Sequence, residues 1–180
     1  RQFKGRDCEF RLFLPLYNAV SWMEIGVPEG NTFIPMPLSE EKPVVIYGTS
    51  IAQGGCASRP GMAWTAILER QLDYPLINLG FSGNGRLEKP VIDLMTEIDA
   101  KIYVLDCLPN LVNIPDEELE AKIRESVKGL QSKRPSTPIL LVEHSLGSHS
   151  GIINAKRVED CERATKVLQQ TFAQLKSEGV

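Results

Sequence analysis

The sequence PVVIYGTSIAQGG, residues 43–55, decides the fold. It begins with a short, nearly continuous apolar run that ends at Gly48, as expected for a strand that is covered on both faces of a parallel sheet. Ser50 follows two residues later, ahead of a loop of small residues. A serine in this position either caps the next helix or presents its hydroxyl to a ligand, and the other predicted strand ends bear on that choice.

Strand-like and helix-like patterns alternate over the rest of the chain. Apolar runs at 74–80, 101–108 and 137–144 predict three further strands, and apolar residues at helical spacing predict helices over 61–72, 88–98, 115–131 and 154–177. Four strand–helix repeats are typical of an α/β fold, a flavodoxin-like, three-layer doubly wound parallel sheet with the strand order 2-1-3-4-5. In the first of these helices, Trp64, Ile67, Leu68 and Leu72 are expected to face the core.

Residues 1–38 have a different character. Two short runs rich in aromatic and β-branched residues, FRLFLPLYN and SWMEIGV, predict strands, and a proline-rich stretch follows them. So few strands cannot bury an apolar face of their own, so they belong either to a larger β domain or to strands docked on the main body. We favour the first alternative, in which residues 1–38 are the end of an N-terminal β domain with its linker and residues 39–180 form the α/β domain.

Composition excludes several classes of function. The net charge is −3 and no stretch is strongly basic, so no binding of nucleic acid is expected. No run approaches the roughly 18 apolar residues of a membrane span. The four cysteines form no CxxC pair, so neither a zinc site nor another cofactor is expected. Cys56 and Cys107 follow strands that should be neighbours, and a disulfide between them is a hypothesis.

Polar residues and glycines gather where the predicted strands end. In a doubly wound sheet the ligand site lies beyond the carboxyl ends of the strands. Ser50 follows the first strand, the loop GFSGNG (80–85) follows the second, and Asn110 follows the third. The N–H groups of Ser50 and Gly83 and the side-chain amide of Asn110 could converge on one point, which describes an oxyanion hole. The other glycines of the loop, Gly80 and Gly85, are expected to serve its turns.

Three short motifs carry a resemblance to a known family. GTS at 48–50, NLGFSGNG at 78–85 and DCLPN at 106–110 together resemble the SGNH (GDSL-like) hydrolases, a family of esterases and lipases. The resemblance implies that Ser50 is the nucleophile and that Ser50, Gly83 and Asn110 form the oxyanion hole. It also implies a serine esterase that acts on acyl esters, above all acetyl esters, of small molecules or polysaccharides.

The threonine of GTS stands where the family usually has aspartate, a variant that resembles polysaccharide-esterase-like members from gut bacteria. Members of that branch carry a β-sandwich ahead of the catalytic domain. The resemblance therefore implies that residues 1–38 are the end of such a sandwich, and it implies a periplasmic or secreted location. The sequence indicates no oligomeric state.

The family's catalytic histidine belongs to an Asp-x-x-His pair near the C-terminus, and this sequence contains no such pair. Its two histidines, His144 and His149, are preceded three residues earlier by Leu141 and Leu146. We therefore expect the sequence to be a fragment that lacks the fifth strand, the Asp-x-x-His loop and the last helix. A serine without a general base is a poor nucleophile.

His144 and Arg59 are candidates for substrate binding. His144 ends the fourth predicted strand, two strands and so about 10 Å from the strand of Ser50, which is too far for direct action as a base. A substrate contact or a structural role is expected for it, and His149 lies in a loop that could fold inward. Arg59 and Trp64 follow the nucleophile loop and could touch substrate, although a surface charge and a core aromatic are the simpler interpretations.

Two other functions remain open on the same fold. A non-catalytic glycan-binding or scaffold protein becomes the better interpretation if the complete gene also lacks Asp-x-x-His. A phosphate binder is disfavoured, because the first loop lacks the series of Ser, Thr and Gly donors that would surround a phosphate group.

Overall fold

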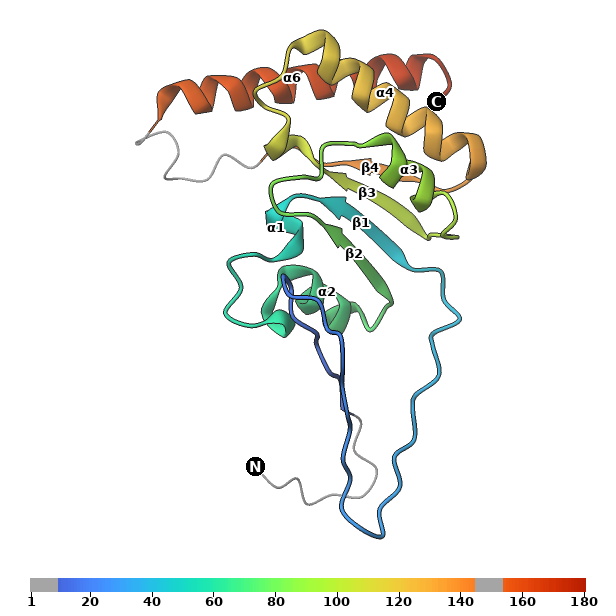
Figure 1. The fold of residues 1–180 in the computed structure, drawn as a ribbon. Helices are drawn as coiled ribbons and strands as arrows, with labels where there is room; N and C mark the ends of the chain where they lie inside the picture. The colour runs from blue at the N-terminus through green and yellow to red at the C-terminus, as the bar shows by residue number, and fades with distance from the viewer. Residues whose placement is uncertain (1–9, 145–153) are drawn as a thin grey trace.

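The computed structural model describes residues 10–144 and 154–180. Within them, the strands β1 (Val44–Gly48), β2 (Leu76–Gly80), β3 (Ile102–Asp106) and β4 (Ile139–Leu141) form one parallel sheet. Their order in the sheet is β2-β1-β3-β4 (Figure 1). The predicted α/β fold with a doubly wound parallel sheet is therefore confirmed for these strands.

Helices cover both faces of the sheet. The described helices are α1 (Ser50–Gln53), α2 (Trp64–Leu72), α3 (Lys89–Met95), α4 (Asp116–Lys133) and α6 (Ala155–Ser177), with the short 3₁₀ turns η1 (Pro60–Met62) and η2 (Leu108–Asn110). Helices α3, α4 and α6 lie on one face and α1 and α2 on the other (Figure 1). No helix among the described residues is both long enough and apolar enough to cross a membrane.

Strand alternation divides the core between the two faces. Val45 and Tyr47 of β1 join the larger cluster under α4 and α6, whereas Ile46 joins a smaller cluster with Ala52 and Val104. In the register of the sheet, Gly48 at the end of β1 lies opposite Gly80 of β2 and Asp106 of β3. The carboxyl ends of three strands therefore meet at one edge.

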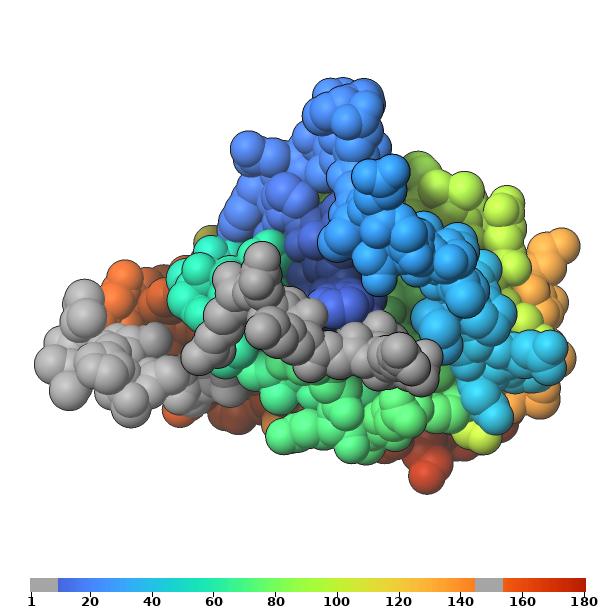
Figure 2. Space-filling model, turned by 90° about the horizontal axis from the view of Figure 1, so that it is seen from below, coloured from blue at the N-terminus to red at the C-terminus, as the bar shows by residue number. Residues whose placement is uncertain are grey.

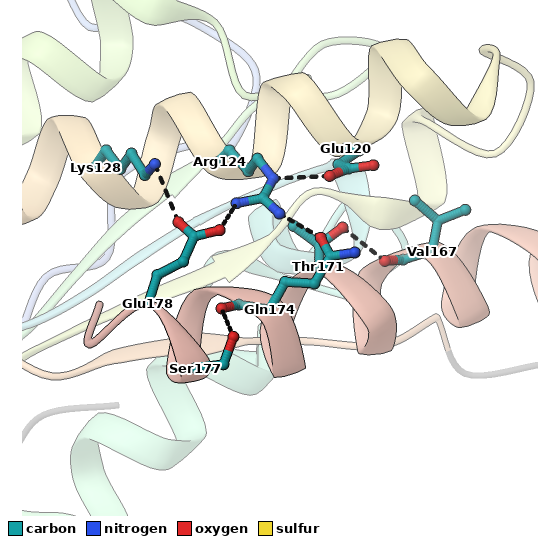
Figure 3. Close-up of polar contacts among 8 residues, drawn as sticks. All are labelled: Glu120, Arg124, Lys128, Val167, Thr171, Gln174, Ser177 and Glu178. Atoms are coloured by element: carbon teal, nitrogen blue, oxygen red, sulfur yellow. Dashed lines mark hydrogen bonds and ion pairs between the residues drawn. The ribbon is translucent and has the colours of Figure 1, made fainter.

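A polar network joins α4 to α6 on the outer face. The guanidinium of Arg124 donates to Glu120 at 2.8 Å, to Glu178 at 2.8 Å and to Gln174, and Lys128 lies 3.3 Å from Glu178 (Figure 3). These side chains are partly exposed, so each pair adds little by itself. The network instead fixes how the two helices lie side by side above the main core.

The buried face of α2 differs from the predicted one. Among its residues only Thr65 is fully buried, and Trp64 and Leu72 are 39% and 58% exposed. The reason lies in β2, where Asn78 donates from Nδ2 to Thr65 Oγ1 at 2.8 Å and to the Ala52 carbonyl at 2.9 Å. A buried amide needs these oxygens, and α2 therefore turns a small polar residue toward the sheet.

Residues 10–43 form no strand in this structure, so the strands predicted for FRLFLPLYN and SWMEIGV are wrong for this structure. They run as a long excursion below the sheet (Figure 1), and their atoms stand in front of the α/β body in the view from below (Figure 2). Many of their large apolar side chains are exposed, Trp22 at 73% and Leu38 at 94% among them. The N-terminal β-sandwich and the domain boundary at residues 38–39 stay predictions.

Cys56 and Cys107 are both free, so the hypothesis of a disulfide between them is wrong for this structure. Cys107 is buried in the main core, 3.6 Å from the Tyr47 carbonyl, and burial raises the pKa of its thiol. Cys56 is exposed in the loop that follows α1. Neighbouring strands do not suffice for a disulfide, because the geometry of the bond is specific and Cys107 is buried in the core while Cys56 is exposed in a loop.

The loop after β2 is packed against the end of β1. The N–H of Phe81 donates to the Gly48 carbonyl at 2.9 Å. Gly85 has a φ of +68°, and a Cβ added there would lie 2.1 Å from the same carbonyl oxygen. Gly83 has a similar φ of +74° but nothing within 4 Å of such a Cβ. The two glycines therefore share a left-handed backbone and differ in the space around it.

Replacing Gly85 with alanine is expected to destabilise the protein more than replacing Gly83. Gly83→Ala adds only the strain of a left-handed residue, about 1 kcal/mol. Gly85→Ala adds a clash with Gly48 as well, for a total of about 3 kcal/mol. Urea unfolding of the two variants measures this difference. Equal losses of stability would show that the loop does not rest on β1 as described.

Asp106 ends β3 as a buried carboxyl. It is 9% exposed, and burial raises its pKa from the ordinary value of 3.8 to about 6. No hydrogen bond or ion pair offsets this burial among the described residues. The folded protein therefore holds the proton of Asp106 more tightly than the unfolded chain does.

The stability that depends on this proton is expected to fall as the pH rises. It is complete below about pH 4 and lost above about pH 6, with a total change of about 3 kcal/mol for two pKa units. Asp106→Asn does not titrate at this position. The free energy of unfolding of the variant, relative to that of the parent protein, should therefore be higher at pH 7.5 than at pH 4 by this amount. Urea unfolding at both pH values measures the gain. A difference that does not change with pH would contradict the assignment.

Candidate active site

Ser50 is the first residue of α1, and the preceding residue, Thr49, caps the N-terminus of this helix. The buried Thr49 is the N-cap residue, and its Oγ1 accepts a hydrogen bond from the N–H of Ile51 at 3.3 Å. The interpretation of Ser50 as a helix cap is therefore not supported, because Thr49 takes that role. Ser50 is half-buried and lines a pocket at the protein surface.

Two glycines let α1 approach the strand ends closely. A Cβ at Gly48 would lie 2.6 Å from the Cβ of Ala52, and a Cβ at Gly80 would lie 2.1 Å from the backbone nitrogen of Gln53. Gly80 was expected to serve a turn, but the structure shows that it leaves room for the helix. Ser50 is thereby held directly above the edge where β1 and β2 end.

The second loop carries Gly83 at an exposed position beside α1. The N–H of Ser82 donates to the side-chain oxygen of Gln53 at 2.7 Å, which ties the loop to the helix. Gly83 is exposed, and its N–H has no hydrogen-bond acceptor among the described residues. This N–H is therefore available to a ligand.

Asn110 reaches the same loop from the end of β3. It closes the 3₁₀ turn η2, and its Nδ2 donates to the backbone carbonyl of Asn84, the residue after Gly83. A primary amide carries two N–H groups, so one can hold the loop while the other remains for a ligand. The structure thus brings Asn110 to the loop of Gly83, and it places Ser50 on the helix to which that loop is bonded.

A hydrogen-bonded pair, the buried Tyr47 and the half-buried Glu88, anchors the far end of the loop. Tyr47 of β1 donates its hydroxyl to Glu88, which also accepts from the N–H of Arg86 at 2.6 Å. Burial, followed by the bond to Glu88, raises the pKa of Tyr47. Burial alone would raise the pKa of Glu88, but the hydrogen bonds from Tyr47 and the Arg86 backbone lower it below its usual value. The loop is therefore fixed to β1 at both ends.

The pocket beside Ser50 has a volume of about 470 Å³. Ser82 of the second loop lines it together with Ile51, Met62, Trp64 and Tyr17. Trp64 donates from Nε1 to the Ile51 carbonyl at 2.9 Å. Its interpretation as a core aromatic is therefore wrong, because its ring lines a surface pocket.

Sequence reasoning missed the contribution of Tyr17 to this pocket. Tyr17 belongs to the N-terminal segment, and the run LPLYN was interpreted there only as part of a strand. No local pattern connects this run with the loop after Ser50. The glycines at 54, 55 and 61 were the available signal, since glycines can mark a place where another segment approaches the backbone closely.

The candidate substrate-binding residues are less well placed. Arg59 is exposed at the start of η1 and does not line the pocket, and its contact with substrate stays a prediction. His144 is half-buried just beyond β4, with β3 between β4 and β1. At about 4.8 Å for each strand, the expected separation of about 10 Å from the strand of Ser50 is retained. His149 lies outside the described residues.

The residues that the structure describes hold no cluster of three or more His, Cys, Asp or Glu side chains that could bind a metal ion. The strand ends present the Ser50 hydroxyl, the N–H of Gly83 and the side-chain amide of Asn110. Asp106, whose pKa burial raises to about 6, lies opposite Gly48 at the same edge. Its side chain is on the face of the smaller core cluster, beneath α1.

Comparisons with solved structures find proteins of similar fold. A protein described as a GDSL-like lipase from Bacteroides ovatus is 37% identical, with a TM-score of 0.72, over 78% of this chain and 40% of its own. The chain thus spans less than half the length of that protein. A protein of the G-D-S-L family from Desulfitobacterium hafniense, described as lipolytic, is 14% identical, with a TM-score of 0.54, over 76% of this chain and 74% of its own.

A third structure, a salicylyl-acyltransferase from a tetracycline biosynthetic pathway, is 20% identical, with a TM-score of 0.53, over 73% of this chain and 40% of its own. At this level of identity, it and the Desulfitobacterium protein show the fold alone. A search of the curated proteins finds no match.

Family models match nearly the whole chain. A model described as the "N-terminus of Esterase_SGNH_hydro-type" matches residues 1–33. The model of the GDSL-like Lipase/Acylhydrolase family matches residues 41–180, which include Ser50, Gly83 and Asn110. The resemblance seen in the three motifs is confirmed, and the chain belongs to the GDSL-like lipase/acylhydrolase family.

Proposed function

We propose that this chain carries the nucleophile and the oxyanion hole of a serine esterase that removes acetyl groups from carbohydrate. One observation carries the proposal: Ser50, free of a capping role, begins a helix bonded to the loop of Gly83, and Asn110 is bonded to that same loop. Family membership supports ester hydrolysis as the reaction. The specific acyl group and carbohydrate are inferred from the resemblance described above.

In the proposed reaction, the Ser50 hydroxyl attacks the ester carbonyl and loses its proton to a general base. The carbonyl oxygen becomes an oxyanion that accepts hydrogen bonds from the N–H groups of Ser50 and Gly83 and from the second N–H of Asn110. The C–O bond to the alcohol then breaks and the alcohol takes up the proton, which leaves an acyl-enzyme. Water attacks this ester in the same way and releases the acid.

We propose that His144 is not the general base. Direct proton transfer needs hydrogen-bond distance, and His144 follows a strand about 10 Å from that of Ser50. His149 and the parts of the full-length protein outside this sequence are the remaining candidates. A hydrolysis assay therefore has to use the full-length protein.

Two further parts of the proposal concern the chain as a whole. We propose the division into an N-terminal β domain at residues 1–38 and a catalytic domain at residues 39–180. It is supported by the family models, which match 1–33 and 41–180 separately. A periplasmic or secreted location is proposed from the family resemblance.

Ser50→Ala in the full-length protein is expected to abolish hydrolysis of p-nitrophenyl acetate. Loss of the nucleophile should lower kcat by at least about a thousandfold, to the level left by binding and the oxyanion hole. Ser58→Ala is the matched control, because Ser58 is exposed in the same loop and does not line the pocket. Hydrolysis unchanged by Ser50→Ala would contradict Ser50 as the nucleophile, whereas absence of hydrolysis in the unmutated full-length protein would favour a non-catalytic glycan-binding protein.

Asn110→Ala is expected to lower kcat by about 10²–10³-fold and to change KM little, because an oxyanion donor acts mainly on the transition state. Asn113→Ala removes the same type of side chain from an exposed position three residues later and serves as the control. A rise in KM at constant kcat would instead assign Asn110 to substrate binding.

A further inference from the structure

The N-terminal segment docks on the loop that follows Ser50. A Cβ at Gly61 would lie 2.9 Å from the ring of Phe13, and one at Gly55 would lie 2.1 Å from the hydroxyl of Tyr17. A Cβ at Gly54 would lie in ordinary contact with the side chain of Leu16, at 3.6 Å. We call these three glycines, Gly54, Gly55 and Gly61, the glycine platform. Residues 13–17 lie on it because it has no side chains.

Polar and charged contacts hold the segment in this position. Gln53 donates from Nε2 to the Leu16 carbonyl at 2.5 Å, while its side-chain oxygen accepts from Ser82. One amide therefore links the N-terminal segment, α1 and the second loop. On α2, the Arg70 guanidinium lies 5.3 Å from the centre of the Phe13 ring, a distance suited to a cation–π contact.

Tyr17 consequently forms part of the pocket that contains Ser50. Its hydroxyl end is held against Gly55, yet the residue as a whole is 60% exposed. Trp64 is also partly exposed, at 39%, and its Nε1 donates to the Ile51 carbonyl. The Tyr17 ring lies against Gly55, the Trp64 ring is fixed by its Nε1–H, and both residues leave ring surface open beside the candidate nucleophile.

We infer that Tyr17 is a specificity-determining residue that, together with Trp64, binds the sugar ring carrying the scissile ester. An acetyl group is small, and a pocket of about 470 Å³ leaves space for a larger group next to Ser50. Aromatic rings provide flat apolar surfaces, which suit the C–H faces of a pyranose, and the few polar atoms at the rim can bond its hydroxyls. This inference rests on the proposed function for the identity of the reacting group.

The test separates sugar binding from catalysis in the full-length protein. Binding of xylotetraose to the Ser50→Ala variant, with and without Tyr17→Ala, is measured by titration calorimetry. Loss of one aromatic surface should raise Kd about tenfold. In the protein with Ser50 intact, Tyr17→Ala should lower the ratio of kcat/KM for acetylated xylotetraose to that for methyl acetate by a similar factor.

Trp22→Ala is the matched control, since Trp22 is an aromatic of the same segment, 73% exposed, that does not line the pocket. Tyr17→Leu keeps an apolar side chain and replaces Tyr17→Ala if that variant fails to fold. Gly61→Ala should also raise the Kd for xylotetraose and lower the kcat/KM ratio, because the added methyl group displaces Phe13 and loosens the docked segment.

Unchanged Kd and an unchanged ratio in Tyr17→Ala would overturn the inference, even where Ser50→Ala abolishes hydrolysis and the proposed function stands. Weaker xylotetraose binding in Tyr17→Ala would support sugar binding even where Ser50→Ala retains full hydrolysis and the proposed function fails. If Tyr17→Ala lowers kcat/KM only for methyl octanoate relative to methyl acetate, the pocket binds the acyl chain and the sugar assignment is overturned.

Discussion

The close contact between α1 and the ends of β1 and β2 is the constraint on which the site depends. At Gly48 and Gly80 no Cβ fits between strand and helix, since the nearest atoms of Ala52 and Gln53 would lie 2.6 Å and 2.1 Å away. The helix therefore starts directly at the sheet edge, and its first residue, Ser50, has a fixed position relative to the loops around it. Because protein interiors are packed as densely as organic crystals, a methyl group at either glycine would move the helix, and Ser50 would move with it.

The donors around Ser50 are held by bonds that need no substrate. The second loop is fastened to β1 by the Phe81 N–H and by the Glu88 carboxylate, and to α1 by Gln53. Asn110 is bonded to the loop as well. Donors that are already in place lose no energy to reorganisation when charge develops on an oxyanion. The same logic extends to the N-terminal segment, because the amide of Gln53 that holds the loop also holds Leu16.

Features that follow from local patterns were predictable, and features that follow from contacts distant in the sequence were not. The helix predicted over 115–131 is an example of the first kind, because apolar spacing within one segment decides it; the buried residues of α4 include Leu119, Ile123, Val127 and Leu130. The strand order was expected from the fold class as a whole. The orientation of α2 depends instead on Asn78, a polar residue inside β2 that draws Thr65 inward and leaves Trp64 at the surface. The three motifs marked the strand ends, but the pocket wall supplied by Tyr17 arises only when a separate segment docks on glycines.

Two carboxyl groups lie near this edge, and their surroundings move their pKa values in opposite directions. Hydrogen bonds from Tyr47 and from the Arg86 backbone stabilise the charged form of Glu88. The carboxylate of Glu88 therefore serves to bind the loop to β1. Asp106 has no such partner among the residues that the structure describes, and burial raises its pKa to about 6. A buried acid without a partner destabilises the fold at neutral pH, and residues that break local rules in this way tend to occur at functional sites. Since Asp106 lies opposite Gly48, two residues before Ser50, this destabilising acid lies at the strand end that precedes the proposed nucleophile.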